Sequence, residues 1–95
     1  MALTRVRWTH GALADLLAIG RYIEQDNPVA ARSVVTRVEL AGNRLGEFPE
    51  RGRAGRIEGT RELVIPGLPF IIVYRVALGE VALLTVVHGA QQYPP

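Results

Sequence analysis

The stretch Ile23–Ala31, which reads IEQDNPVAA, decides the fold because it separates two segments of helical hydrophobic periodicity. Asn27 is a favoured N-cap residue, and Pro28 suits the first position of a helix, where its missing N–H would have no partner in any case. The stretch therefore ends one helix and begins another. Two helices joined by so short a turn are expected to form an antiparallel hairpin.

The two helices are predicted from their caps and their apolar periodicity. The first is expected at His10–Gln25, with Thr9 as its N-cap. The second is expected from Pro28 to about Gly46, before Pro49. Apolar residues recur three and four positions apart, at Ala12, Leu13, Leu16, Leu17, Ile19, Gly20 and Ile23 and at Ala31, Val34, Val35, Val38, Ala41, Gly42 and Leu45. We expect both apolar faces to pack on one sheet.

Strand patterns surround the helical hairpin. Leu3–Trp8 alternates apolar and polar residues, as a strand with one buried face does. The later segments are a loop at Phe48–Arg56, strands at Arg61–Pro66, Phe70–Val76 and Val81–His88, and a tail at Gly89–Pro95. The second of these strands is so uniformly apolar that it should lie in the centre of the sheet. The chain is thus predicted to be one α+β domain, residues 1–95, in the order strand, helix, helix and three strands.

The composition excludes several classes of protein. No cysteine is present, which excludes a disulfide framework, a thiolate metal site and a cysteine nucleophile. The longest apolar run, Leu68–Tyr74, is too short to cross a membrane, and the amino terminus lacks the apolar segment of a secretory signal. No phosphate-binding loop, nucleophile elbow or zinc-protease motif occurs. We expect a cytoplasmic protein without a metal ion or other cofactor.

Every basic residue is an arginine, and the net charge of +2 is too small by itself to indicate a nucleic-acid ligand. Arginines and glycines are interleaved at Arg51, Gly52, Arg53, Gly55, Arg56, Gly59 and Arg61. This pattern is typical of a loop that binds a phosphate or an acidic peptide. It also fits a solvated loop whose arginines pair with Glu50, Glu58 and Glu62, and composition alone favours this second interpretation.

Arg61 and Arg75 fall within predicted strands, each on a face that also carries apolar residues. A guanidinium in that position must find partners or reach solvent. The two arginines either mark a polar pocket at the sheet surface, or they pair with Glu62 or Glu80 or extend into solvent.

Two side chains near the carboxyl terminus are candidates for chemistry or binding. His88, at the end of the last strand, suits a general acid or base beside a phosphate-binding arginine, although a lone histidine there is more often a packing or capping residue. Tyr93 in the tail suits an acid, a stacking surface or a docking anchor. His10 is expected to be exposed.

Six motifs along the chain carry a resemblance to a known family through their order and spacing: Trp8 with Ala12–Ile23, Asn27–Ala31, Leu45–Arg53, Gly59–Leu63, Ile72–Arg75 and His88–Pro94. Together they resemble toxins of the ParE/RelE superfamily of toxin–antitoxin systems, over nearly the whole chain. The pattern is most similar to the ParE branch, whose members are often described as plasmid stabilisation proteins.

This resemblance implies a helical hairpin on a twisted, mainly antiparallel sheet, a ParD-like antitoxin encoded alongside, and inhibition of DNA gyrase. Antitoxins of this kind usually lay a carboxy-terminal segment along the hairpin and sheet of the toxin. The apolar faces of both helices are also wider than one sheet face requires, and such a surplus usually serves a partner. The residues expected to contact the antitoxin, in a hetero-oligomer, are Leu16, Tyr22, Val35 and Val38.

The surface expected to act on the target consists of Arg53, Arg61, Arg75, His88 and Tyr93. An alternative is the RelE branch, whose members cleave messenger RNA on the ribosome. In that case the catalytic residues would be Arg61, Arg75, His88 and Tyr93, but the lysines of the RelE pattern are absent. We therefore favour gyrase inhibition without catalysis. A further alternative is a non-toxic module that only binds the antitoxin.

Overall fold

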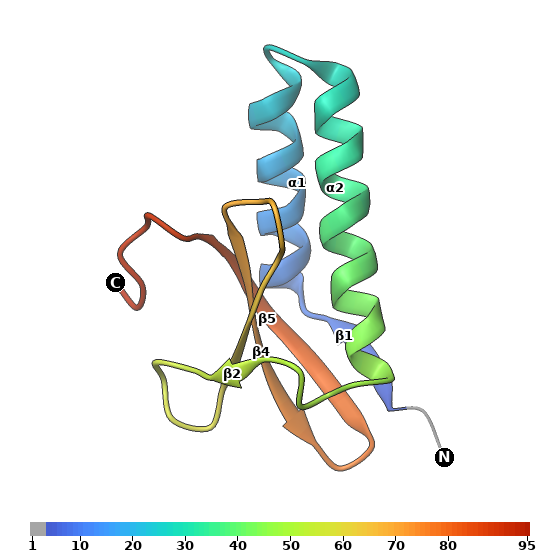
Figure 1. Cartoon of the computed structure of the whole chain (residues 1–95), viewed down its shortest axis with the longest axis vertical. Helices are drawn as coiled ribbons and strands as arrows, with labels where there is room; N and C mark the ends of the chain where they lie inside the picture. Colours follow the sequence, from blue (N-terminus) through green and yellow to red (C-terminus); the bar gives the residue numbers. More distant parts are fainter. Residues whose placement is uncertain (1–3) are drawn as a thin grey trace.

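The computed structural model describes residues 4–95 and has the predicted α+β architecture (Figure 1). Its elements are β1 (Arg5–Trp8), α1 (His10–Glu24), α2 (Pro28–Asn43), the 3-10 turn η1 (Arg44–Gly46), β2 (Arg53–Ala54), β3 (Arg61–Val64), β4 (Phe70–Ala77) and β5 (Glu80–His88). Leu3, the first residue of the predicted amino-terminal strand, lies outside the described residues.

Both helices begin at the predicted caps. The N–H of Ala12 donates to Oγ1 of Thr9 at 3.2 Å, and the N–H of Ala30 donates to Oδ1 of Asn27 at 3.0 Å. Pro28 occupies the first turn of α2 as expected. The side-chain oxygens thus satisfy N–H groups that have no partner within a helix. The expected end of the second helix at Gly46 is correct only if the 3-10 turn is included.

The sheet has the strand order β1-β5-β4-β3-β2, in which β1 and β5 are parallel and the other neighbours are antiparallel. The apolar strand β4 is central, as predicted. The short strand β2 lies within the segment Phe48–Arg56, which was expected to be a loop. That prediction was wrong for Arg53 and Ala54, because two residues are too few to give a periodic pattern and their pairing with β3 defines them as a strand.

The helical hairpin packs on one face of the sheet, and the main core lies between them. Ile72, Tyr74 and Leu83 are fully buried there against Val38 of α2. Helix α2 approaches the sheet closely at Gly42, where a Cβ atom would lie 2.7 Å from the Trp8 ring. Any larger residue at that position would force the helix away from β1 and β5.

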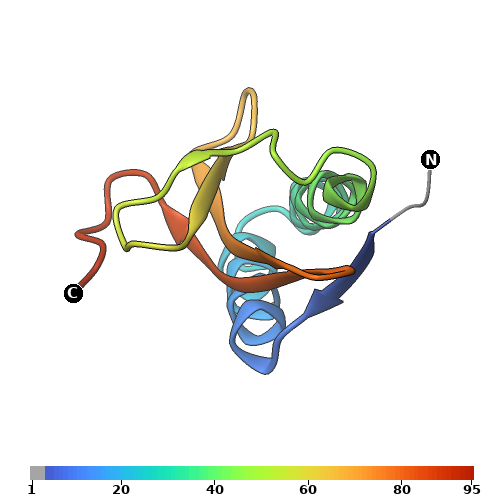
Figure 2. The ribbon, with the colours of Figure 1, turned by 90° about the horizontal axis from the view of Figure 1, so that it is seen from below.

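The opposite face, called here the helix-free face, carries Ile71, Val73 and Arg75 of β4. Ile71 and Val73 form a second apolar cluster with Val87, against which Tyr93 of the tail packs. Figure 2 shows the tail and the loop before β3 at the end of the molecule away from the amino terminus. A short tail segment thus covers part of a face that lacks helices.

The helical hairpin is longer than the part of the sheet that supports it. In Figure 1 the turn between α1 and α2 stands beyond every strand, along the 41 Å axis of the molecule. Apolar side chains remain exposed on the two helices, at Leu13, Leu17, Tyr22, Val29 and Leu40. Among residues 4–95, neither helix is long and apolar enough to cross a membrane.

Candidate functional site

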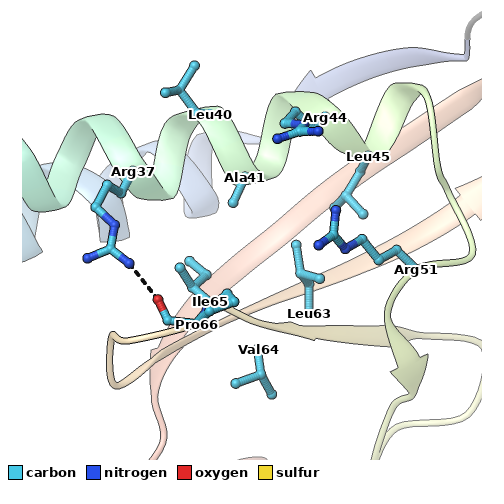
Figure 3. A pocket seen from close by; sticks show the side chains of 10 residues that line it. All are labelled: Arg37, Leu40, Ala41, Arg44, Leu45, Arg51, Leu63, Val64, Ile65 and Pro66. Carbon is cyan, nitrogen blue, oxygen red and sulfur yellow. Dashed lines mark hydrogen bonds between the residues drawn. The ribbon is translucent and has the colours of Figure 1, made fainter.

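A groove of about 340 Å³ lies between α2 and β3, and we call it the α2–β3 groove (Figure 3). It is lined by Arg37, Leu40, Ala41, Arg44, Leu45, Arg51, Leu63, Val64, Ile65 and Pro66. Leu63 points toward the helix from the strand, and Ala41 points toward the strand from the helix (Figure 3). The groove therefore has an apolar floor built by two segments that are distant in sequence.

The groove has an unpaired strand edge along one side. Strand β2 pairs with Arg61 and Glu62 only, so the outer edge of β3 is open from Leu63 onward. The N–H of Ile65 donates inward to the carbonyl of Phe70 at 3.2 Å. Because alternate residues of a strand direct their peptide groups to opposite sides, those of Val64 face outward. An added strand would find a backbone donor and acceptor at Val64.

Arginines surround this apolar floor. Arg37, Arg44 and Arg51 line the groove, and no carboxylate is among its lining residues. Arg37 donates to the carbonyl of Pro66, and none of the ion pairs within residues 4–95 involves these three side chains. A partner with apolar and acidic side chains in an extended conformation matches such a surface in shape and charge.

The structure places the four residues expected to contact an antitoxin in different environments. Tyr22 is 75% exposed near the turn of the hairpin, and Val35 is partly buried against the core. The prediction for Leu16 and Val38 needs correction, because both side chains are buried in the core and present no surface to a partner. The middle of a helix's apolar stripe packs inside the protein, and a partner meets its margin instead.

The sequence analysis did not identify the edge of the apolar face of α2 as part of a binding surface. Arg37, Leu40, Ala41 and Arg44 are three and four positions apart, so they share one side of the helix. Leu40 is 57% exposed, although it is a large apolar residue. Together with Ala41 and Leu63, this leucine belongs to the arginine-rimmed lining of the groove, which suits an amphipathic acidic partner.

On the helix-free face, two arginines of the loop that could either bind an anion or pair internally contact a carboxylate. Glu62 is only 2% exposed, and its Oε1 lies 3.2 Å from a guanidinium nitrogen of Arg53 and 3.3 Å from Nε of Arg56. The backbone N–H of Arg56 also donates to its Oε2 at 2.9 Å. Burial pushes the pKa of Glu62 upward, but these hydrogen bonds and charges outweigh it and lower the pKa.

Arg56 also holds the tail in place. Its guanidinium donates to the carbonyl of Tyr93 at 2.9 Å and lies 5.6 Å from the centre of the Tyr93 ring. We call Arg53, Arg56, Glu62 and Tyr93 the tail cluster. For Arg53 and Arg56, the structure agrees with the interpretation in which the loop arginines pair with Glu62.

Arg61 and Arg75 do not line one pocket, so the first of the two alternatives for these arginines is excluded. Arg61 pairs with Tyr74 across the β3–β4 ladder, so it shares the face of that core residue, whereas Arg75 points to the helix-free face. Arg61 donates to the carbonyl of Gly52 at 2.8 Å. The hydroxyl of Tyr74 accepts from the N–H of Gly52 at 2.8 Å, and burial raises its pKa.

His88 has the packing and capping contacts of a structural histidine. Its Nδ1 accepts from the N–H of Ala90 at 3.0 Å, and its ring meets the edge of Phe70 with the two planes at 87°. Taken with the positions of Arg61 and Arg75, this means that the side chains proposed for RNA cleavage are spread over two faces and one end of the sheet.

Residues 6–93 match the family described as "ParE toxin of type II toxin-antitoxin system, parDE". A protein of Sinorhizobium fredii named "Putative toxin Y4kP" is 50% identical over 94 residues, 99% of this chain and 97% of that protein. Toxin RelE2 of Caulobacter vibrioides is 40% identical over 89 residues, 94% of this chain and 99% of that protein. The solved chromosomal ParDE TA system from P. aeruginosa has a chain similar to this one, with a TM-score of 0.83 and 26% sequence identity, covering 90% of this chain and 96% of that one.

A mainly antiparallel sheet covered on one face by a helical hairpin, together with these relatives, defines the toxin of a type II toxin–antitoxin system. The chain belongs to the ParE toxin family. The resemblance inferred from the six sequence motifs is thereby confirmed.

Proposed function

We propose that this toxin inhibits DNA gyrase in the cytoplasm, without turning over a substrate, and that a ParD-like antitoxin neutralises it. The observation that carries the gyrase proposal is the match to the ParE family over residues 6–93, because gyrase inhibition is what resemblance to that branch implies. The separation of Arg61 and Arg75 on two faces supports it as well. A nuclease needs its acid, base and cations gathered at one phosphate.

The antitoxin is proposed to bind in the α2–β3 groove through an extended segment. Three features support this: the apolar floor at Ala41 and Leu63, the open edge of β3 at Val64, and the cationic rim that includes Arg44. A strand added to β3 would gain main-chain hydrogen bonds, while its side chains meet the floor and the rim. The exposed Tyr22 lies near the far end of the hairpin and suits contact with a helical part of the antitoxin.

The gyrase proposal is tested by a supercoiling assay with the purified chain and purified gyrase. Supercoiling is expected to fall and gyrase–DNA cleavage complexes to accumulate, and prior addition of the antitoxin is expected to abolish both effects. A chain that leaves supercoiling unchanged and traps no cleavage complex contradicts the proposal.

The competing function is cleavage of translated messenger RNA, which the 40% identity to Toxin RelE2 favours. Primer extension on messages from cells that express the toxin separates the two functions. Codon-linked cuts that disappear in His88→Ala or Arg75→Ala, but persist in the control Arg32→Ala, would establish the nuclease. Unaffected growth without the antitoxin would instead favour a non-toxic binding module.

A further inference from the structure

The helix-free face carries arginines that neither the α2–β3 groove nor the tail cluster uses. Val6 of β1 packs against the core, so Arg5 and Arg7 on either side of it point to the opposite face. By the same alternation, Arg75 points away from the buried Tyr74. All three arginines are exposed.

The strand register brings these side chains into a row. Arg7 is paired with Ala82 of β5, and Arg75 is paired with the same alanine from the other side. Neighbouring strands are spaced by about 4.8 Å, so the Cα atoms of the two arginines are about 10 Å apart. The short side chain of Ala82 leaves the space between them open. Arg5 lies two residues before Arg7 and extends the row along β1.

One carboxylate accompanies the three cations. Glu80 is paired with Arg5 in the register, and its Oε1 lies 3.1 Å from Nε of Arg7. Arg75 takes part in none of the ion pairs within residues 4–95. We call Arg5, Arg7 and Arg75 the arginine row. Its local charge is positive even after Glu80 is counted.

We propose that the arginine row binds the phosphodiester backbone of a nucleic acid. A guanidinium presents a planar fork of donors that matches a phosphate, and exposed arginines on an open face can reach the phosphates of a nucleic-acid backbone. An acidic protein segment added as a strand is a poorer occupant here, because β5 and the facing edges of β1 and β4 are already paired within the sheet. Such a segment could pair only along the outer edge of β1, two strands away from Arg75.

The proposal does not rest on the identity of the toxin's target. The row lies on β1 and β4 on the helix-free face, whereas the α2–β3 groove opens at β3 beside α2. A partner seated in the groove therefore leaves the row accessible. Contacts to phosphates carry no information about the bases, so binding is expected to be independent of sequence.

The test is fluorescence anisotropy of the purified chain with two probes, a labelled 20-base-pair DNA duplex and a labelled 20-nucleotide single strand, between 50 and 200 mM NaCl. Three phosphate contacts predict that duplex affinity falls about 40-fold over this range, because each contact contributes about −0.9 to the log–log slope. Arg75→Gln and Arg7→Gln are each expected to reduce the slope by about 1. The two probes separate double-stranded from single-stranded ligands.

Arg32→Gln is the matched control, because it removes the same charge from an exposed position of α2 on the hairpin. It is expected to bind both probes as the unchanged chain does. Equal losses in Arg32→Gln and Arg75→Gln would overturn the proposal, since net charge alone would then explain binding. Absence of binding at 50 mM NaCl would overturn it too.

Two further measurements keep the test independent of folding defects. Glu80→Gln removes the carboxylate that pairs with Arg7 and is expected to tighten duplex binding about threefold, a gain that misfolding does not produce. Poly-L-glutamate, added at the same charge concentration as unlabelled duplex, is expected to compete poorly. Equal competition by poly-L-glutamate would overturn the assignment in favour of an acidic protein partner.

Discussion

Two inner strands of this sheet, β5 and β3, extend beyond a shorter neighbour, and the protein treats their uncovered edges differently. At the β5 edge, where β1 has ended, Asp15 of α1 accepts from the N–H of Val86 at 3.0 Å and from the hydroxyl of Thr85. At the β3 edge, beyond Glu62, the peptide groups of Val64 face an open groove. A strand edge normally invites pairing with another chain. One edge is closed from within, and the other is the edge at which we propose that the antitoxin binds.

The arginines of the two regions show the same contrast. Arg53 and Arg56 on the helix-free face share the buried Glu62, whereas Arg44 and Arg51 rim the groove without a carboxylate among its lining residues. Both regions contain closely placed arginines. The presence of an internal acidic partner therefore distinguishes arginines that stabilise the fold from arginines available to another molecule.

The largest expected effect is a loss of stability when the side chain that closes the β5 edge is removed. Asp15→Ala removes the acceptor of a backbone N–H and a hydroxyl, and we expect the free energy of unfolding to fall by about 2 kcal/mol. Urea unfolding measures it. Asp26→Ala, at an exposed position in the hairpin turn, is the control and should change stability by less than about 0.5 kcal/mol. Equal stability of the two variants would show that Asp15 does not close the edge.

A substitution at the open edge of β3 should lower antitoxin affinity and leave stability nearly unchanged. Val64→Pro removes an N–H that faces outward, so the ladder to β4 keeps its hydrogen bonds, but a strand added in the groove loses one. We expect antitoxin affinity to fall roughly thirtyfold, about 2 kcal/mol, with little change in unfolding. Val64→Thr keeps the N–H and should bind normally. A proline variant that binds the antitoxin with full affinity would exclude strand addition at β3.

A charge placed among the lining residues of the groove sharpens the comparison further. Leu40→Glu puts a carboxylate among the apolar lining residues, and we expect antitoxin affinity to fall about tenfold through lost apolar contact and repulsion of acidic side chains. Leu17→Glu is the matched control, because Leu17 is similarly exposed on α1 and does not line the groove. Titration calorimetry with the antitoxin compares the two. Equal losses of antitoxin affinity in both variants would show that the antitoxin binds outside the groove.

The smallest expected effect concerns how the stability contributed by Glu62, the carboxylate that pairs with Arg53 and Arg56, depends on pH. The folded pKa of Glu62 is below its ordinary value of 4.5, so its contribution to stability is complete above that value and is lost as the pH falls through the folded pKa. Urea midpoints measured from pH 7 to pH 3 should therefore decline more steeply in the unchanged chain than in Glu62→Gln. Parallel profiles would mean that Glu62 does not contribute to acid sensitivity.

Local rules were enough to predict much of the fold. Thr9 and Asn27 cap helices through hydrogen bonds within three residues, and β4 is central because its apolar residues are buried on both faces. The parallel pairing of β1 with β5 was not predicted from the residues, because nothing local to Arg5–Trp8 specifies a partner so distant in sequence.

The candidate site was harder to predict for the same reason. The groove joins the margin of α2 to β3, and Arg51 reaches it from the intervening loop. Periodicity correctly identified the apolar face of each helix, but its central residues, such as Leu16 and Val38, are used by the core. The surplus apolar surface was correctly anticipated, while its location depended on where the sheet ends.

The pairing of β1 with β5 has a consequence for biosynthesis. Trp8 is paired with Leu83 in the ladder, and the carboxylate of Asp15 accepts from the N–H of Val86. These early parts of the chain therefore find their partners only after β5 has left the ribosome. A nascent or prematurely terminated product that lacks β5 cannot assemble the core. Formation of the complete sheet therefore depends on synthesis of β5.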